Sequence, residues 1–363
     1  MKNINQISSK QIKALVVSTV VGVGILTLPN EISLVMGNDG WIAIILSGLL
    51  VIPFLIIINK IFELYPNKDF FQIGREVLGK WIFNIFLIVL LFDCILVSAS
   101  VARNLAEMIK AFLLLTTPTE IIIVTFIIAT SYIARLDVQI ISRAGYHIYP
   151  IVIGFIILLT LVTLAELDFT NMLPVFQSSI KQLPKGIQTT FFSYMGFEIL
   201  LFVLPFAEER EKTLKSSLMG IALVILVYTV IFVISLSQYG LSHLQRQTFP
   251  TLSLIKEIDL PGFFIENLDG LVVAIWVIIV FGSIAPFYYA GGKILSNLCS
   301  TKSQDLFILP LLPLIYIIAL MPQNIIELSS KLGKVLNYAG LFSAILMPMI
   351  IYCIGYYKTR RRA

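Results

Sequence analysis

The chain has 363 residues, of which 58% are hydrophobic and only 13% are charged, and its mean hydropathy is +0.94. This composition excludes a water-soluble globular domain and indicates a membrane protein with short loops. The net charge of +5 does not indicate nucleic-acid binding, because the basic residues lie at the ends of apolar runs. The three cysteines form no CxxC motif and no Cys/His cluster, so we expect free thiols and no metal site.

Apolar runs recur along the whole chain, and a helix needs roughly 20 such residues to cross about 30 Å of hydrocarbon. We therefore predict an all-α polytopic membrane protein, a single domain of about ten transmembrane helices. The first run is too long for a signal peptide and lacks a cleavage site, so we expect it to remain. The predicted spans lie near residues 12–35, 41–59, 82–115, 120–135, 145–165, 186–206, 216–238, 269–290, 306–321 and 335–357.

Lysine and arginine residues predict the orientation, because cationic segments are retained on the cytoplasmic side during insertion. With the N-terminus inside, most of the 26 basic residues fall in inner segments, including the cluster from Lys358 to Arg362. Both termini are therefore expected in the cytoplasm, and this cluster is expected to contact anionic lipid headgroups.

Two long connections, 60–80 inside and 239–268 outside, have the same pattern. Each begins with an aromatic residue and proline, continues through a short amphipathic helix, expected over 69–78 and 251–260, and ends at a glycine. Their positions on opposite sides of the membrane predict two inverted five-helix repeats. The repeats would cover about 12–165 and 186–357.

The first span is expected to be interrupted, because residues 20–29 read VVGVGILTLP. Glycine removes side-chain constraint and proline withholds a hydrogen-bond donor. Free N–H groups at the start of the second half-helix suit a carboxylate, and free carbonyls suit an ammonium, so a zwitterionic amino acid fits both. The alternative is that Gly22 and Gly24 permit close helix packing and Pro29 is a simple kink.

The sixth span contains a corresponding break, because residues 191–198 read FFSYMGFE. Unwound backbone in hydrocarbon is tolerated where protein or a water-filled cavity satisfies its polar groups. The pair of breaks therefore favours a small-ligand site at the membrane midplane. An intramembrane carboxylate such as Glu198 indicates function because its burial is costly. The alternative is a protonated structural carboxyl that is hydrogen-bonded to the backbone.

These motifs carry a resemblance to known families. GVGILTLP together with FFSYMGFE resembles the amino acid/polyamine/organocation superfamily of transporters, which implies a LeuT-like fold. The opening ISSKQIKALVVSTVVGVGILTLPN, the segments NDGWIAIILSG and NLAEMIKAFLL, and FPTLSLIKEIDLPGFFIENLDGLVVAIWV together resemble the permease-like B subunit of spore nutrient germinant receptors. The likeness covers nearly the full length, and only the combination of motifs is specific.

The resemblance implies a set of ligand-binding residues. The N–H groups of Val23, Gly24 and Ile25, beside Gly22, would hold the ligand carboxylate. Carbonyls near Val20, Phe192 and Met195 would hold its amino group, with Phe192 as an aromatic lid and Glu198 as a ligand or coupling carboxylate. Many transporters have serine where this chain has Val23, so carboxylate binding would depend on the backbone.

Other polar residues in the spans have two readings. Asp93 lies at midplane depth as a second proton or ion carboxylate, or as a cap for a neighbouring broken helix. One of Ser98 and Ser100 is expected to face the cavity, with Ser98 as the candidate, unless it packs or bonds within its own helix. Ser283 and Phe287 share a helix face and are expected to contact the ligand side chain, with ordinary packing as the alternative.

A second polar group lies near the outer end of the third span. Arg103 and Glu107 are four residues apart, with Lys110 three further on, so they share one helix face. We interpret them as an internal ion pair with a snorkelling lysine. Contact with a partner is the alternative.

Two functions follow from these features. The resemblance implies a receptor subunit that binds a small germinant, an amino acid, in the spore inner membrane and triggers germination with partner A and C subunits. The alternative is an amino-acid transporter, proton-coupled through Glu198 or Asp93. We expect no enzyme, cofactor or nucleic-acid partner, because the sequence contains no nucleophile–base constellation and no phosphate-binding loop.

Overall fold

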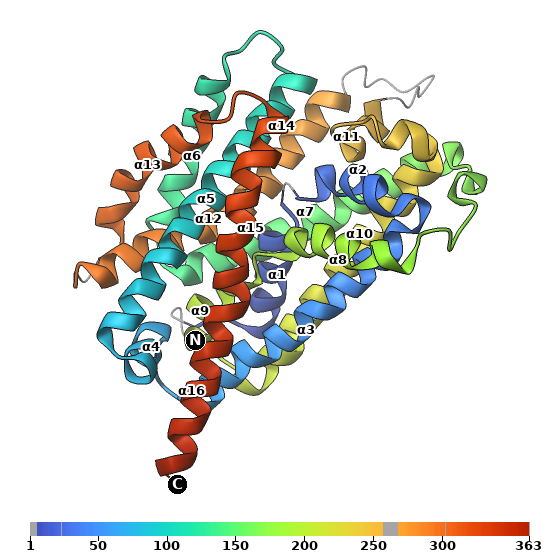
Figure 1. Ribbon diagram of the computed structural model, residues 1–363. Coiled ribbons are helices and arrows are strands. Elements are labelled where there is room, and N and C mark those ends of the chain that lie inside the picture. The colour runs from blue at the N-terminus through green and yellow to red at the C-terminus, as the bar shows by residue number, and fades with distance from the viewer. Residues whose placement is uncertain (1–5, 23, 257–267, 302, 363) are drawn as a thin grey trace.

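The computed structural model describes residues 6–22, 24–256, 268–301 and 303–362, and within them helical segments overlap each of the ten predicted spans (Figure 1). Among the described residues, six helices are long and apolar enough to cross a membrane, and a bent helix pair adds a seventh. One of the six runs from the second half of the first predicted span into the second span. Two further apolar helices are shorter, so ten remains an approximate count.

The helices follow one another with short connections. In chain order they are α1 (Ser9–Val20), α2 (Gly24–Met36), α3 (Gly40–Leu64), α4 (Phe70–Leu78), α5 (Lys80–Phe112), α6 (Thr119–Ala134), α7 (Val138–Thr163), α8 (Leu183–Phe191), α9 (Leu200–Val203), α10 (Arg210–Leu244), α11 (Pro250–Lys256), α12 (Leu268–Leu298), α13 (Asp305–Leu320), α14 (Ile325–Glu327), α15 (Gly333–Leu341) and α16 (Met347–Arg362). Shorter turns that the argument uses are η1 (Gly37–Asp39), η5 (Phe192–Tyr194), η6 (Phe197–Ile199), η7 (Leu204–Phe206), and the π-helical η8 (Leu328–Leu332) and η9 (Phe342–Leu346).

Helix α1 lies at the centre of the bundle, where it packs against α10, α7 and α12. Its residues from Ala14 to Val20 are all buried. The outer helices instead present apolar side chains to the surroundings. On α5 the exposed Trp81, Ile85, Ile88 and Phe92 recur at helical spacing and form one continuous stripe. Such a stripe suits contact with lipid, while the opposite face of α5 packs inward.

The short helix predicted in the inner connection is confirmed as α4. Asp69 caps its N-terminus by accepting a hydrogen bond from the Gln72 N–H, while the Gln72 side chain accepts one from the Asp69 N–H. The helix ends at Gly79, whose φ of 80° favours glycine.

The short helix predicted in the outer connection begins as α11, at Pro250. Its described part ends at Lys256, so the rest of the predicted helix lies outside the described residues. Thr251 donates a hydrogen bond from Oγ1 to the carbonyl of Ile25 at 2.8 Å, which fixes α11 on α2. In Figure 1, α4 and α11 lie toward opposite ends of the bundle.

The predicted ion pair on α5 is confirmed, with 2.7 Å between Arg103 Nη2 and Glu107 Oε1. The buried guanidinium also donates to the carbonyls of Ala319, at 3.5 Å, and Gln323, at 3.3 Å. The Ala319 carbonyl lies in the last turn of α13, where backbone acceptors have no helical partner, and Gln323 lies just beyond the helix. Lys110 donates to Thr119 Oγ1 at the start of α6, at 3.5 Å. This polar group therefore connects α5 to two neighbouring helices.

We predict that Arg103→Leu lowers the free energy of unfolding by about 3–5 kcal/mol, because it leaves Glu107 and the α13 carbonyls unpaired. Thermal unfolding in detergent micelles measures the effect. The matched control is Lys331→Leu, which removes the exposed ion pair to Glu327 and should cost about 0–1 kcal/mol. Equal losses in both variants would contradict a structural role for Arg103.

Candidate functional site

The predicted interruption of the first span is confirmed. Helix α1 ends at Val20, the Gly22 N–H donates to the Val20 carbonyl at 2.9 Å instead of making a helical bond, and α2 begins at Gly24. Val23 lies outside the described residues. The N–H groups of Gly24 and Ile25 open a helix, so they have no intrahelical acceptor. They are among the groups that the family resemblance assigns to a ligand carboxylate.

The sixth span is interrupted as predicted. Its two parts, Ile180–Tyr194 and Phe197–Phe206, meet at an angle of 44°. Met195 is extended, and Gly196 has a φ of 125°, a conformation that L side chains rarely adopt. A Cβ atom on Gly196 would lie 3.3 Å from the carbonyl oxygen of Thr19 in α1. The second break therefore packs directly on the end of the first half-helix.

The two breaks also approach each other at the glycines of the first span. A Cβ atom on Gly24 would lie 3.4 Å from Ser193 Cβ in the second break.

The first break also packs tightly on α12. A Cβ atom on Gly22 would lie 2.6 Å from Ser283 Oγ and 2.8 Å from Ser283 Cβ, closer than real contacts allow. Ser283, predicted on the eighth span, is therefore held against the first break, where its hydroxyl donates to Val280 within α12.

Tyr228 of α10 joins the two breaks. Its hydroxyl is within 2.9 Å of the carbonyl oxygens of both Val20 and Ser193, and the residue is fully buried. A hydroxyl has one hydrogen, so it donates fully to one of these carbonyls at a time. The Val20 carbonyl also accepts the Gly22 N–H, so both of its lone pairs are used. An ammonium that binds this carbonyl would have to replace one of these donors.

Sequence reasoning missed Tyr228, although a tyrosine in an apolar span carries a signal, because its hydroxyl needs a partner away from water. Tyr194 of the second break follows the same rule, since its hydroxyl donates to the Ile44 carbonyl at 2.9 Å. Glu31 of α2 was also missed, and its carboxyl interacts with the Thr27 side chain. A carboxylate shortly after the first break was the available signal.

Two predicted carboxyl groups lie in the interior. Glu198 is 3% exposed, and its Oε2 accepts the Gly196 N–H at 2.9 Å, which fits the alternative reading of a backbone-bonded carboxyl. Asp93 is fully buried and accepts a hydrogen bond from Ser343 Oγ at 2.5 Å. Asp93 and Glu198 are close enough to interact electrostatically.

The remaining candidates have mainly packing contacts. Ser98 donates to the Cys94 carbonyl of its own helix at 2.7 Å. Phe287 is buried one turn beyond Ser283 on α12. Phe192 is half-buried, with its ring centroid 6.5 Å from that of Phe191.

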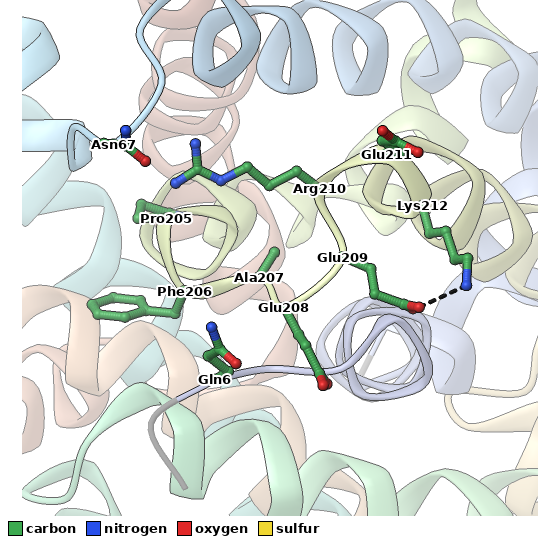
Figure 2. Close-up of a pocket in the computed structure, with 10 residues that line it drawn as sticks. All are labelled: Gln6, Asn67, Pro205, Phe206, Ala207, Glu208, Glu209, Arg210, Glu211 and Lys212. Atoms are coloured by element: carbon green, nitrogen blue, oxygen red, sulfur yellow. Dashed lines mark hydrogen bonds and ion pairs between the residues drawn. The ribbon is translucent and has the colours of Figure 1, made fainter. Parts of the chain in front are cut away.

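A polar cavity of about 850 Å³ lies at the foot of the sixth span, between the N-terminal segment and the start of α10. Figure 2 shows Arg210 extended toward Asn67 across this cavity, with Glu208 on its other side. The N-terminal segment pairs with the adjoining chain, because the Ile7 N–H donates to Phe206 at 2.8 Å and the Ile7 carbonyl accepts the Glu208 N–H at 3.0 Å. The cavity therefore adjoins the end of both interrupted spans.

We predict that Gly22→Ala destabilises the protein by about 1–3 kcal/mol, the usual effect of overpacking, because the new methyl group overlaps Ser283. Gly24→Ala is the matched control, since its methyl group would make an ordinary contact with Ser193. Thermal unfolding in detergent measures both variants. Adding Ser283→Gly to Gly22→Ala should restore much of the loss, and failure of this rescue would contradict the contact.

Comparison with known proteins gives the family of the chain. A family model described as spore germination protein matches residues 6–328. The chain is 25% identical over 357 residues to spore germination protein YndE of Bacillus subtilis (strain 168), covering 98% of both chains. It is 26% identical over 362 residues to spore germination protein GerLB of Bacillus cereus, covering 98% of this chain and 96% of that protein.

Solved transporter structures share the fold. MhsT in complex with L-phenylalanine superimposes with a TM-score of 0.70 at 12% identity, covering 94% of this chain and 87% of MhsT. MHP1, a nucleobase-cation-symport-1 family transporter, gives a TM-score of 0.63 at 11% identity, covering 93% and 79%. The fold class predicted from the sequence is thus confirmed. The chain is an integral membrane protein with a LeuT-like permease fold and belongs to the spore germination protein family.

Proposed function

We propose that this chain is the B-type subunit of a nutrient germinant receptor, which binds a small amino acid between its two broken helices and triggers germination. The observation that carries the proposal is the meeting of the two breaks at Gly24 and Ser193, with the Tyr228 hydroxyl between their carbonyls. Two relatives of nearly the same length are spore germination proteins, which supports this role.

The ligand carboxylate would bind the N–H groups at the start of α2, from Gly24 and Ile25, where the helix dipole is positive. Val23, outside the described residues, would contribute a third group. The amino group would bind carbonyls near Val20, Phe192 and Met195, with Phe192 as the lid. The Phe192 carbonyl now accepts the Met195 N–H at 3.2 Å, so ligand binding would exchange one partner for another.

The side chain of the ligand would point toward α12 and α5. Ser283 and Phe287 would contact it from α12, and Ser98 from α5. The close approach of Gly22 and Ser283 leaves no room for an added methyl group between them, so Ser283 borders the first break directly. Glu198 would act through the Gly196 backbone rather than by contact with the ligand, because its carboxylate accepts the Gly196 N–H.

The assembly would be a complex in the spore inner membrane with receptor A and C subunits. Both termini would lie in the cytoplasm, with the basic residues after Lys358 at anionic headgroups. The domain would consist of inverted repeats over about 12–165 and 186–357, which suits alternating motion around a central site. The chain would act by binding and signalling without catalysis or a cofactor.

An amino-acid transporter is the second candidate. The cavity at the foot of the sixth span favours it, because this space would be a release path from the breaks toward the side of the N-terminus. A receptor can keep the same release path, and a conformational change of the helices around that path can then serve as its signal.

We predict that Tyr228→Phe destabilises the ligand-free protein by about 1–3 kcal/mol, because it leaves a buried carbonyl without a donor. The ligand ammonium then no longer competes with the hydroxyl, so amino acids should raise the melting temperature of this variant more than that of the wild type. Thermal shift assays of purified protein across amino acids measure this. An unchanged ligand-induced shift would argue against an ammonium at these carbonyls.

The receptor proposal is tested in two arms. The purified chain in proteoliposomes should show no concentrative uptake of radiolabelled amino acids, and deletion of the neighbouring receptor subunit genes should abolish the response of spores to the nutrient. Robust uptake by the chain alone, together with normal germination of the deletion strains, would favour the transporter. Uptake by the Gly22→Ala chain, whose first break is altered, is the control that shows whether any transport passes through the breaks.

A further inference from the structure

Two carboxyl groups from different spans lie together in the interior of the bundle. Asp93 is on α5 and fully buried, and Glu198 is on η6 directly after the second break and 3% exposed. They are close enough to interact electrostatically. Since η6 contacts η9 and α5 contacts both η9 and α15, three spans meet at these two side chains.

The hydrogen bonds of the pair are incomplete. Asp93 Oδ2 accepts the Ser343 hydroxyl, but Asp93 Oδ1 is buried and has no hydrogen-bond partner among the described residues. Thr19, which packs on Gly196 at the same break, also has a buried hydroxyl without a partner in this part of the chain. A buried carboxylate oxygen without a donor is costly, and this cost points to a bound positive group.

A local irregularity in the tenth span brings Ser343 to Asp93. Ser343 lies in the π-helical turn η9, and such turns are frequent at functional sites. One turn earlier, a Cβ atom on Gly340 would lie 2.5 Å from Met195 Sδ and 3.8 Å from Asp93 Oδ1. The tenth span therefore packs closely against both the carboxyl pair and the second break.

Cationic side chains of the surrounding elements are engaged elsewhere, within the residues that the structure describes. Arg103 of α5 pairs with Glu107, and Lys293 of α12 donates to Gln304. Lys13 of α1 lies over the ring of Tyr149, and Lys334 of α15 is exposed. The titratable group next to Asp93 in the chain is the Cys94 thiol, which carries no positive charge.

Two ionised carboxylates at close range in a medium of low dielectric constant repel each other strongly, so such a pair takes up one positive charge. A metal ion such as Ca²⁺ or Mg²⁺ needs about six oxygen ligands, and the described residues contain no group of three or more acidic, histidine or cysteine side chains that could hold one. A proton needs only one carboxyl oxygen. We propose that Asp93 and Glu198 together carry one proton, which removes their repulsion and holds the third, sixth and tenth spans together.

This site is distinct from the proposed amino-acid site and stands whether or not that ligand is correct. Loss of the proton would leave two repelling charges and push Glu198 away from α5. Because the same carboxylate accepts the Gly196 N–H, this movement would reach the second break directly. The proton would therefore couple the arrangement of the tenth span to the conformation of the broken sixth span.

Infrared spectroscopy of the purified full-length chain in lipid nanodiscs tests the proposal. The wild type at neutral pH should show the carbonyl stretching band of a protonated carboxylic acid, which shifts in D₂O. The double variant Asp93→Asn/Glu198→Gln should lose the band completely. Each single variant should alter its position or shape, because the charge of each carboxyl acts on the proton that the pair carries. Ser343→Ala, which removes one hydrogen bond to Asp93 with a minimal change of volume, should also shift it.

The matched control is Glu120→Gln, which changes an exposed carboxylate of α6 and should leave the band as in the wild type. Thermal unfolding of each variant establishes that it is folded. Absence of the band in the wild type, or its persistence in the double variant, would overturn the proposal. A single variant with an unchanged band would show that one carboxyl alone holds the proton. Disappearance of the band when Na⁺ replaces choline would instead assign the site to a metal ion.

Discussion

Backbone N–H and carbonyl groups released inside a membrane must find partners in the protein, because hydrocarbon offers none and each unpaired group costs several kcal/mol. The two breaks meet this constraint with side chains from elsewhere in the chain. Tyr228 of α10 serves the Val20 and Ser193 carbonyls, and Thr251 of α11 serves Ile25. The geometry of the breaks is therefore a property of the packed bundle, and neither interrupted span would hold its shape alone.

The same constraint explains how far the sequence predicts the fold. Apolar runs, the glycines of the breaks and the short helix α4 are local features, and each was located correctly from the sequence. The Arg103–Glu107 pair was also predictable, because its spacing of four residues fixes both side chains on one helix face. The number of transmembrane spans was predicted only approximately, because α13 is shorter than a typical span and α2 continues into α3.

The parts of the site that the sequence did not predict depend on contacts between residues far apart in the chain. Nothing near Tyr228 in the sequence indicates that its hydroxyl reaches carbonyls 208 and 35 residues away. The π-helical turn at Ser343 has no local sequence signature, and its bond to Asp93 joins residues 250 apart. The sequence singled out Asp93 as a carboxylate at midplane depth, and the structure buries it, but its partners depend on the register between helices, which periodicity does not define.

The pairing of Ile7 with the end of the sixth span links the beginning of the described chain to both interrupted helices. Ile7 is fully buried and lies two residues before α1, while its hydrogen bonds hold Phe206 and Glu208 on either side of Ala207. A force applied to the first few residues would thus be transmitted to both half-helices at once. Fusion tags for purification or imaging are therefore better attached after α16, since a fusion near Ile7 would strain the hydrogen bonds that join it to the end of the sixth span.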